Sequence, residues 1–93
     1  MELNGKVALV VGAGGGIGLG IATAMAKEGC RVALADVSED ALKQAAATNP
    51  DMVWKVVDAT DRQSVADLFA WAEADVGPVE VVAYSAGINI ANR

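Results

Sequence analysis

The sequence contains no histidine and only one cysteine, Cys30. Without histidine, the chain lacks the side chain that most often acts as a general base or a metal ligand. With one cysteine, it can form neither an intramolecular disulfide nor a CxxC metal or redox site. We therefore expect no metal centre, an inert small filler at Cys30, and a reducing, cytoplasmic setting.

Basic side chains are also scarce, since seven Lys and Arg stand against twelve Asp and Glu, a net charge of −5. A phosphate backbone repels a chain of this sign, so we expect no nucleic-acid partner. Of the 93 residues, 54% are hydrophobic and 20% charged, which is typical of a folded soluble protein. The length allows one modest core, so we expect one domain over residues 1–93 and no separate substrate domain.

Charge is absent from the twenty residues between Lys6 and Lys27, a length that suits a membrane-spanning helix. Six glycines in this run argue against that alternative, because each interior glycine costs a helix about 1 kcal/mol relative to alanine. The six residues that precede the run have no net positive charge, unlike the start of a signal peptide. We therefore expect no membrane association.

Apolar periodicity and turn residues predict alternating strands and helices. Strands are predicted over residues 7–11, 31–36, 52–57 and 79–83. Helices are predicted from Gly16 to Glu28, from a cap at Ser38 to Asn49, and from a capping box of Thr60 and Gln63 to Gly77. The order βαβαβαβ predicts a parallel sheet with helices on both faces, a three-layer α/β unit that binds ligands at the carboxyl ends of its strands.

Two of the predicted helices carry apolar stripes. The first stripe consists of Ile17, Ile21, Ala24 and Met25, and the second consists of Val65, Leu68, Phe69, Ala72 and Val76. Trp71 lies off the second stripe, so we expect it to face solvent or a partner.

The glycines gather directly after the first predicted strand, where six of ten fall between residues 12 and 20. No Lys followed by Ser or Thr comes after them, which excludes a Walker A loop, and GxGxxG does not fit. GxxxGxG fits in two registers, and we prefer Gly12, Gly16 and Gly18 because Gly12 follows the strand directly. Positive φ, close backbone approach and unpaired helix amides would suit a diphosphate; a flexible loop or tight helix packing is the alternative.

Asp36 ends the second predicted strand, twenty residues after Gly16. A carboxylate at this position can accept hydrogen bonds from the diol of an adenosine ribose and repel a 2′-phosphate. The alternative is a solvated loop acid near the cap at Ser38.

Taken together, VALVVGAGGGIG at 7–18, LAD at 34–36, VVDAT at 56–60 and VVAYSAGI at 81–88 resemble the amino-terminal half of the short-chain dehydrogenase/reductase family. The resemblance implies a Rossmann-like βαβαβαβ unit with a four-stranded parallel sheet of order 3-2-1-4, and NAD as the cofactor. It implies cofactor contacts at Gly12, Gly15, Gly16, Ile17 and Gly18 (diphosphate), Asp36 (adenine ribose), Asp58 and Ala59 (adenine), and Ser85, Ala86 and Gly87 (nicotinamide-side ribose). For Asp58, support of the helix start at Thr60 is the alternative.

This sequence departs from the family pattern at two points. Val11 replaces a threonine of the turn, and Tyr84 and Ser85 replace two asparagines, so nucleotide affinity is expected to be lower. The family's catalytic serine and its tyrosine with a lysine four residues later belong to the half that would follow residue 93, and position 88 is Ile. The resemblance therefore implies NAD-dependent alcohol and carbonyl oxidoreduction in the parent protein, but no catalytic residues and no competent activity in this truncated chain alone.

The resemblance also implies that residues 79–83 lack their usual neighbouring strand. Such an apolar edge would invite a second copy, so that the chain forms a homo-oligomer, or a complementary carboxyl-terminal fragment. A non-catalytic interaction module that assembles through this edge is the alternative function.

Overall fold

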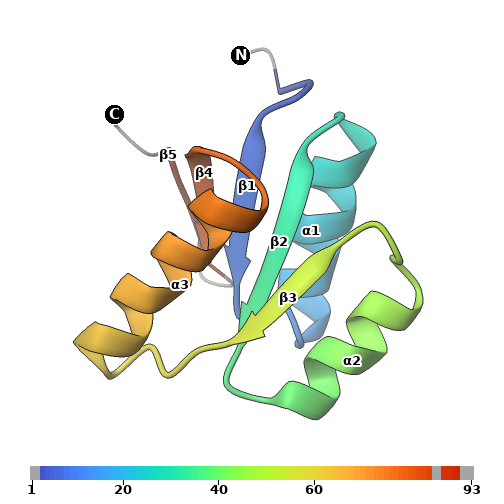
Figure 1. The fold of residues 1–93 in the computed structure, drawn as a ribbon. Helices are drawn as coiled ribbons and strands as arrows, with labels where there is room; N and C mark the ends of the chain where they lie inside the picture. The colour runs from blue at the N-terminus through green and yellow to red at the C-terminus, as the bar shows by residue number, and fades with distance from the viewer. Residues whose placement is uncertain (1–2, 85–86, 91–93) are drawn as a thin grey trace.

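The computed structural model describes residues 3–84 and 87–90, and it contains strands and helices in alternation (Figure 1). The elements are β1 (Val7–Val11), α1 (Gly16–Lys27), β2 (Arg31–Asp36), α2 (Glu39–Ala47), β3 (Val53–Val56), α3 (Arg62–Asp75), β4 (Val79–Tyr84) and β5 (Gly87–Ile90). The predicted order βαβαβαβ is confirmed up to β4, and β5 is additional.

The strands form one sheet in the order β3-β2-β1-β4-β5, and the first four are parallel. The predicted order 3-2-1-4 is therefore confirmed. Helices α1 and α2 cover one face of the sheet and α3 covers the other, which gives the three layers of a Rossmann-like unit (Figure 1).

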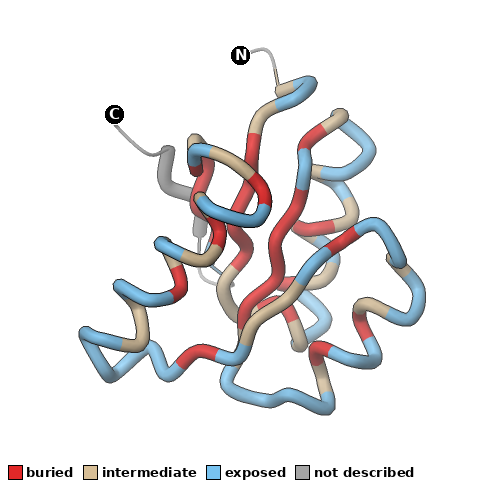
Figure 2. The backbone as a smooth tube through the Cα atoms, in the orientation of Figure 1, coloured by how far each residue is buried: buried red, intermediate tan, exposed pale blue. Residues whose placement is uncertain are grey.

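The central strand β1 is buried on both faces, as its uninterrupted apolar sequence predicts (Figure 2). Ala8 and Val10 belong to the core cluster beneath α1 and α2, whereas Val7 and Leu9 belong to the cluster beneath α3. The alternation follows from the two-residue period of a strand. Because every interior position of β1 packs against a helix, this strand anchors the loop that follows it.

The edge of β4 is not open, which corrects the prediction for residues 79–83. Strand β5 pairs with β4 in the antiparallel sense, with Gly87 opposite Tyr84 and Ile90 opposite Val81. Residues 87–90 alternate glycine or asparagine with isoleucine, a two-residue period typical of a strand. The resemblance implies a cofactor contact at Gly87, which here begins β5. The assembly expected through an open edge of β4 would therefore have to use another surface, because β5 occupies that edge.

The buried face of α1 also differs from the predicted stripe. Gly18 and Ala22 are buried, whereas Ile17 is 70% exposed and Ala24 is exposed; the other two members of the stripe pack against the core. A Cβ on Gly18 would collide with the carbonyl oxygen of Gly12, so the helix approaches too closely for any side chain there. Within residues 3–84 and 87–90, no helix is long and apolar enough to cross a membrane.

Helix α3 begins at Arg62, and its N-cap is Asp61, whose Oδ1 accepts a hydrogen bond from the Gln63 N–H at 3.0 Å. The predicted capping box of Thr60 and Gln63 is therefore wrong. The Thr60 hydroxyl instead donates to Oδ1 of Asp58 at 2.6 Å. Asp61 satisfies the same unpaired helix amides that a threonine cap would.

The apolar face of α3 is as predicted, with Leu68, Ala72 and Val76 buried against the sheet. Trp71, which was expected to face solvent or a partner, is half-buried and packs against the same cluster. Its large ring reaches apolar neighbours that a small side chain at this helical angle would miss.

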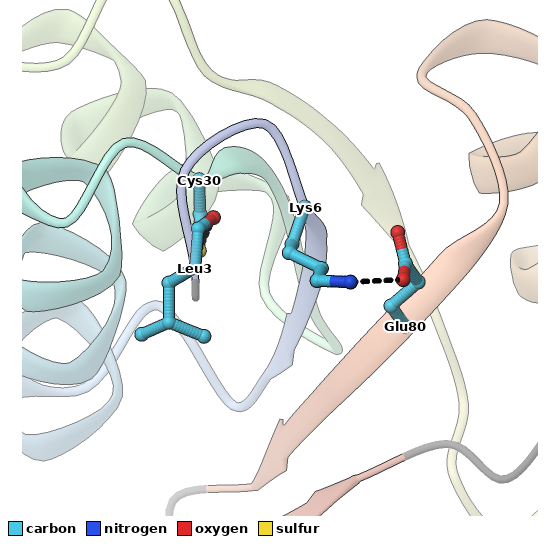
Figure 3. Close-up of polar contacts among 4 residues, drawn as sticks. All are labelled: Leu3, Lys6, Cys30 and Glu80. Atoms are coloured by element: carbon cyan, nitrogen blue, oxygen red, sulfur yellow. Dashed lines mark hydrogen bonds and ion pairs between the residues drawn. The ribbon is translucent and has the colours of Figure 1, made fainter. Parts of the chain in front are cut away.

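Contacts at the amino ends of the strands join distant parts of the chain (Figure 3). Nζ of Lys6 lies 2.9 Å from Oε2 of Glu80, which connects the start of β1 to β4. Sγ of Cys30 donates to the carbonyl oxygen of Leu3 at 3.5 Å. Burial, followed by the charge of Glu28, raises the pKa of the Cys30 thiol, so the thiol stays protonated and unreactive at neutral pH.

Replacing Gly18 with alanine should lower the free energy of unfolding by about 1–3 kcal/mol, the usual cost of overpacking. The added methyl would collide with the Gly12 carbonyl oxygen and lie 2.9 Å from Cα of Ala13. Gly20 is the matched control, because it is exposed on the same helix and an added Cβ would have nothing within 4 Å. Gly20→Ala should raise the free energy of unfolding by about 0.5–1 kcal/mol in urea denaturation. Effects of the same sign would contradict the close approach of α1 to β1.

Candidate functional site

The glycine turn lies at the carboxyl end of β1, the end at which parallel sheets bind ligands. Gly12 has a φ of +84°, which an L side chain rarely adopts. The N–H groups of Gly12 and Ala13 donate to the carbonyl oxygen of Ala35 at 2.8 and 3.1 Å, so the turn is held against β2. Positive φ at Gly12 and the buried contact at Gly18 both support the preferred register of the glycine motif.

The first turn of α1 has unpaired backbone donors. Gly15 is the N-cap and supplies no side-chain hydrogen bond, and the first turn contains no acidic residue. Leu19 donates to the carbonyl oxygen of Gly15, but the N–H groups of Gly16, Ile17 and Gly18 have no acceptor in the part of the chain that the structure describes. Together with the helix dipole, these amides form a site for an anion.

Asp36 is half-buried at the end of β2, beside the glycine turn. Its Oδ2 accepts a hydrogen bond from the Gly14 N–H at 3.0 Å, and its Oδ1 accepts one from the Ser38 N–H at 2.9 Å. Each carboxylate oxygen can accept a further bond. The carboxylate is therefore fixed in orientation and still able to receive hydroxyl donors.

A hollow of about 180 Å³ opens next to Asp36 at the carboxyl ends of β1, β2 and β3. Its lining is Val11, Gly12, Asp36, Val37, Val57 and Ala59. Apart from the carboxylate, the lining side chains are apolar, which suits a flat, weakly polar ring. Val37 is 73% exposed and was not predicted as a site residue; no pattern in the sequence marks it.

A larger hollow of about 600 Å³ lies at the opposite end of the sheet, between the last turns of the helices and the start of β3. It contains neither the glycine turn nor Asp36. Because ligands of parallel sheets bind at the carboxyl ends of the strands, we assign the site to the smaller hollow. No group of three or more potential metal ligands occurs within residues 3–84 and 87–90.

Asp58 is fully exposed in the connection between β3 and α3, and it does not line the hollow, although its neighbour Ala59 does. Its Oδ1 accepts hydrogen bonds from the Thr60 hydroxyl at 2.6 Å and from the Thr60 N–H at 2.9 Å. These bonds, the hydroxyl first, hold the pKa of Asp58 below its ordinary value. In the alternative interpretation, Asp58 supports a helix start at Thr60; Asp58 does bind Thr60, but α3 begins at Arg62 with Asp61 as its cap.

The residues expected at the far end of the site are only partly placed. Tyr84 ends β4 opposite Val11 and is 39% exposed, so its ring borders the same edge of the sheet as the glycine turn. Ser85 and Ala86 lie outside the described residues, and Gly87 begins β5. The structure thus brings together the glycine turn, Asp36 and Ala59, and leaves Asp58 beside them.

Comparison with known proteins agrees with the family resemblance that the sequence motifs showed. The family model described as short chain dehydrogenase matches residues 6–93. Glycine betaine reductase ATRR of Emericella nidulans is 40% identical over 90 residues, which are 92% of this chain and 7% of that protein. Galactitol 2-dehydrogenase of Agrobacterium fabrum is 37% identical over 89 residues, which are 95% of this chain and 35% of that protein.

A solved structure has the same fold. The short chain dehydrogenase/reductase from Burkholderia phymatum, in complex with NAD, superposes with a TM-score of 0.85 and 31% identity, over 88% of this chain and 31% of that one. The chain therefore spans about a third or less of each of these relatives. The matched family model, the relatives and the glycine turn agree that this chain belongs to the short-chain dehydrogenase family.

Proposed function

We propose that this chain is the NAD-binding portion of a short-chain dehydrogenase that interconverts alcohols and carbonyl compounds. The observation that carries the proposal is the set of unpaired N–H groups at Gly16, Ile17 and Gly18, beside the oriented carboxylate of Asp36. A dinucleotide has an anionic diphosphate close to a ribose diol, so it needs donors and an acceptor in this arrangement.

In this proposal the glycine turn binds the diphosphate through Gly12, Gly15, Gly16, Ile17 and Gly18. Ile17 is 70% exposed, so this residue of the first turn of α1 lies at the surface, where a ligand can approach it. Close approach of the diphosphate requires that no Cβ stand in the way, and a Cβ on Gly16 would have nothing within 4 Å, so this position is open to a ligand.

Asp36 would select NAD over NADP. Its carboxylate can accept hydrogen bonds from both hydroxyls of the adenosine ribose, whereas a 2′-phosphate would bring like charge against it. The Gly14 and Ser38 amides hold the carboxylate in place before the ligand arrives, so little ordering remains for the binding step.

The adenine would lie in the apolar hollow beside Val37, Val57 and Ala59. Asp58 would lie at the rim, with the oxygen that Thr60 does not use available to a ring amino group. Ser85, Ala86 and Gly87 are proposed for the nicotinamide-side ribose on the family resemblance.

NAD, when bound, supplies the hydride acceptor; this chain's own residues would bind and orient it. The substrate oxygen must lose a proton to a general base when the alcohol is oxidised, and gain one from the same group acting as an acid when the carbonyl is reduced. The sequence has no tyrosine with a lysine four residues later that could fill this role. We propose that a carboxyl-terminal segment or fragment carries the serine, tyrosine and lysine, and that the protein works in the cytoplasm.

Titration with NADH, followed by tryptophan quenching, should show saturable binding, with NADPH at least tenfold weaker. Asp36→Ala should weaken NADH binding by about tenfold, because it removes the acceptor for the ribose hydroxyls. The same variant should reduce the difference between the affinities for NADH and NADPH, because the carboxylate that repels the 2′-phosphate is gone. Asp51→Ala is the matched control, since Asp51 is an exposed acid at the opposite end of the sheet. If NADH gives no saturable signal at millimolar concentration, the proposed function is wrong.

Thr60→Val should raise the pKa of Asp58 towards its ordinary value, because the Thr60 hydroxyl is the main cause of the lowered pKa. A carboxyl whose pKa is lowered in the folded state stabilises the fold above the pKa of the unfolded state. That contribution is lost as pH falls through the folded-state pKa. NMR titration of the Asp58 side-chain carbonyl measures the midpoint. Thr48→Val is the control, since the Thr48 hydroxyl donates to the carbonyl oxygen of Ala45 instead; an equal shift in both variants would contradict the assignment.

A further inference from the structure

The glycine turn is held by α2 as well as by β1 and β2. The Gly14 N–H donates to Oδ2 of Asp36 at 3.0 Å, and the Ser38 N–H donates to Oδ1 of the same carboxylate at 2.9 Å. Oγ of Ser38 accepts a hydrogen bond from the Ala41 N–H at 3.2 Å. A Cβ on Gly14 would lie 2.5 Å from Cβ of Ala41, so the side chain of Ala41 lies directly against the glycine turn.

Position 14 requires glycine because the surrounding space is too small for a side chain, and not because of its backbone conformation. Among the described glycines, positive φ occurs at Gly5, Gly12, Gly29 and Gly77, and not at Gly14. Its backbone conformation is therefore open to other residues. The space beside it is not, because an added Cβ would meet Ala41 and lie 3.0 Å from Oδ2 of Asp36.

Ala41 has no evident part in the core. It is half-buried on the first turn of α2, and it belongs to neither core cluster, whereas Leu42 and Ala45 of the same helix are buried in one. Its methyl group lies against Gly14 of the glycine turn. Ala41 therefore packs against the turn and not within either core cluster.

We infer that Ala41 is a positioning residue for the glycine turn: the contact of its methyl with Gly14 sets the distance between the turn and the carboxylate of Asp36. The inference rests on the proposed function, in which the turn binds a diphosphate and Asp36 binds the adjoining ribose. A ligand that spans both groups senses this distance. A ligand that contacts Asp36 alone does not.

Ala41→Leu tests the inference with two ligands, ADP and adenosine. The larger side chain keeps a good helix former on α2 but displaces Gly14 from Asp36. We expect ADP to bind about tenfold more weakly than to the wild type, or about 1.4 kcal/mol, while adenosine, which lacks the diphosphate, changes by less than about twofold. Ala47→Leu is the matched control, because Ala47 is the exposed last residue of the same helix, and it should bind both ligands as the wild type does.

Equal losses for the two ligands would indicate general destabilisation and overturn the inference, as would an unchanged affinity for ADP. A second readout needs no ligand. Hydrogen exchange at the Gly14 amide should be about tenfold faster in Ala41→Leu than in the wild type, because its bond to Asp36 is lost, while exchange at the Ser38 amide stays the same. If the wild type binds neither NADH nor ADP, the proposed function fails, and the Gly14 amide alone decides whether Ala41 positions the turn.

A reciprocal pair of variants guards against a folding defect. Gly14→Ala places a methyl against Cβ of Ala41, so it should weaken ADP binding, and adding Ala41→Gly removes that Cβ and should restore part of the affinity. If the losses of ADP affinity in the two single variants add in the double variant, positions 14 and 41 are not energetically coupled, and the inference is overturned.

Discussion

The close approach of α1 to the end of β1 is the constraint on which the site depends. Gly18 lies against the carbonyl oxygen of Gly12, a distance that no side chain at position 18 would allow. The turn between them must reverse sharply in little space, which requires the positive φ of Gly12. This geometry directs the start of α1, with its unpaired amides, towards the same edge of the sheet as Asp36. Core packing and ligand binding thus share one set of small residues.

The charge of the chain and the charge of its proposed ligand have the same sign, since the net charge is −5 and a dinucleotide is an anion. Local structure resolves this conflict. The first turn of α1 has no acidic residue, and its amides present partial positive charge at the point where a diphosphate would lie. Asp36, whose carboxylate accepts a hydrogen bond from the Gly14 amide of the turn, faces hydroxyls in the proposed complex. Binding would therefore depend on oriented backbone groups more than on basic side chains.

The sequence predicted those parts of the structure that follow from local pattern. The bounds of β1 and β2 were correct because each is a continuous apolar run that ends at a glycine or an acid, and Gly12 and Asp36 were identified from their places after these strands. Where two residues competed for the same local bond, the outcome was not predictable: Asp58 takes the Thr60 hydroxyl, and Asp61 becomes the cap. The contact of Gly14 with Ala41 depends on how α2 packs, which no pattern in the sequence encodes. β5 was missed although its alternation was visible.

The pairing of β1 with both β2 and β4 has a consequence during synthesis. Of the described strands β1 is made first, and β2 can join it early, but its other neighbour, β4, is complete only after Tyr84 has been made. At about 5–20 residues per second, an apolar strand therefore waits roughly 4–15 s with one edge unpaired. Until β4 arrives, the nascent chain exposes the kind of edge that associates with other chains. For this fold, the order in which the strands are made therefore sets how long the central strand stays open to association.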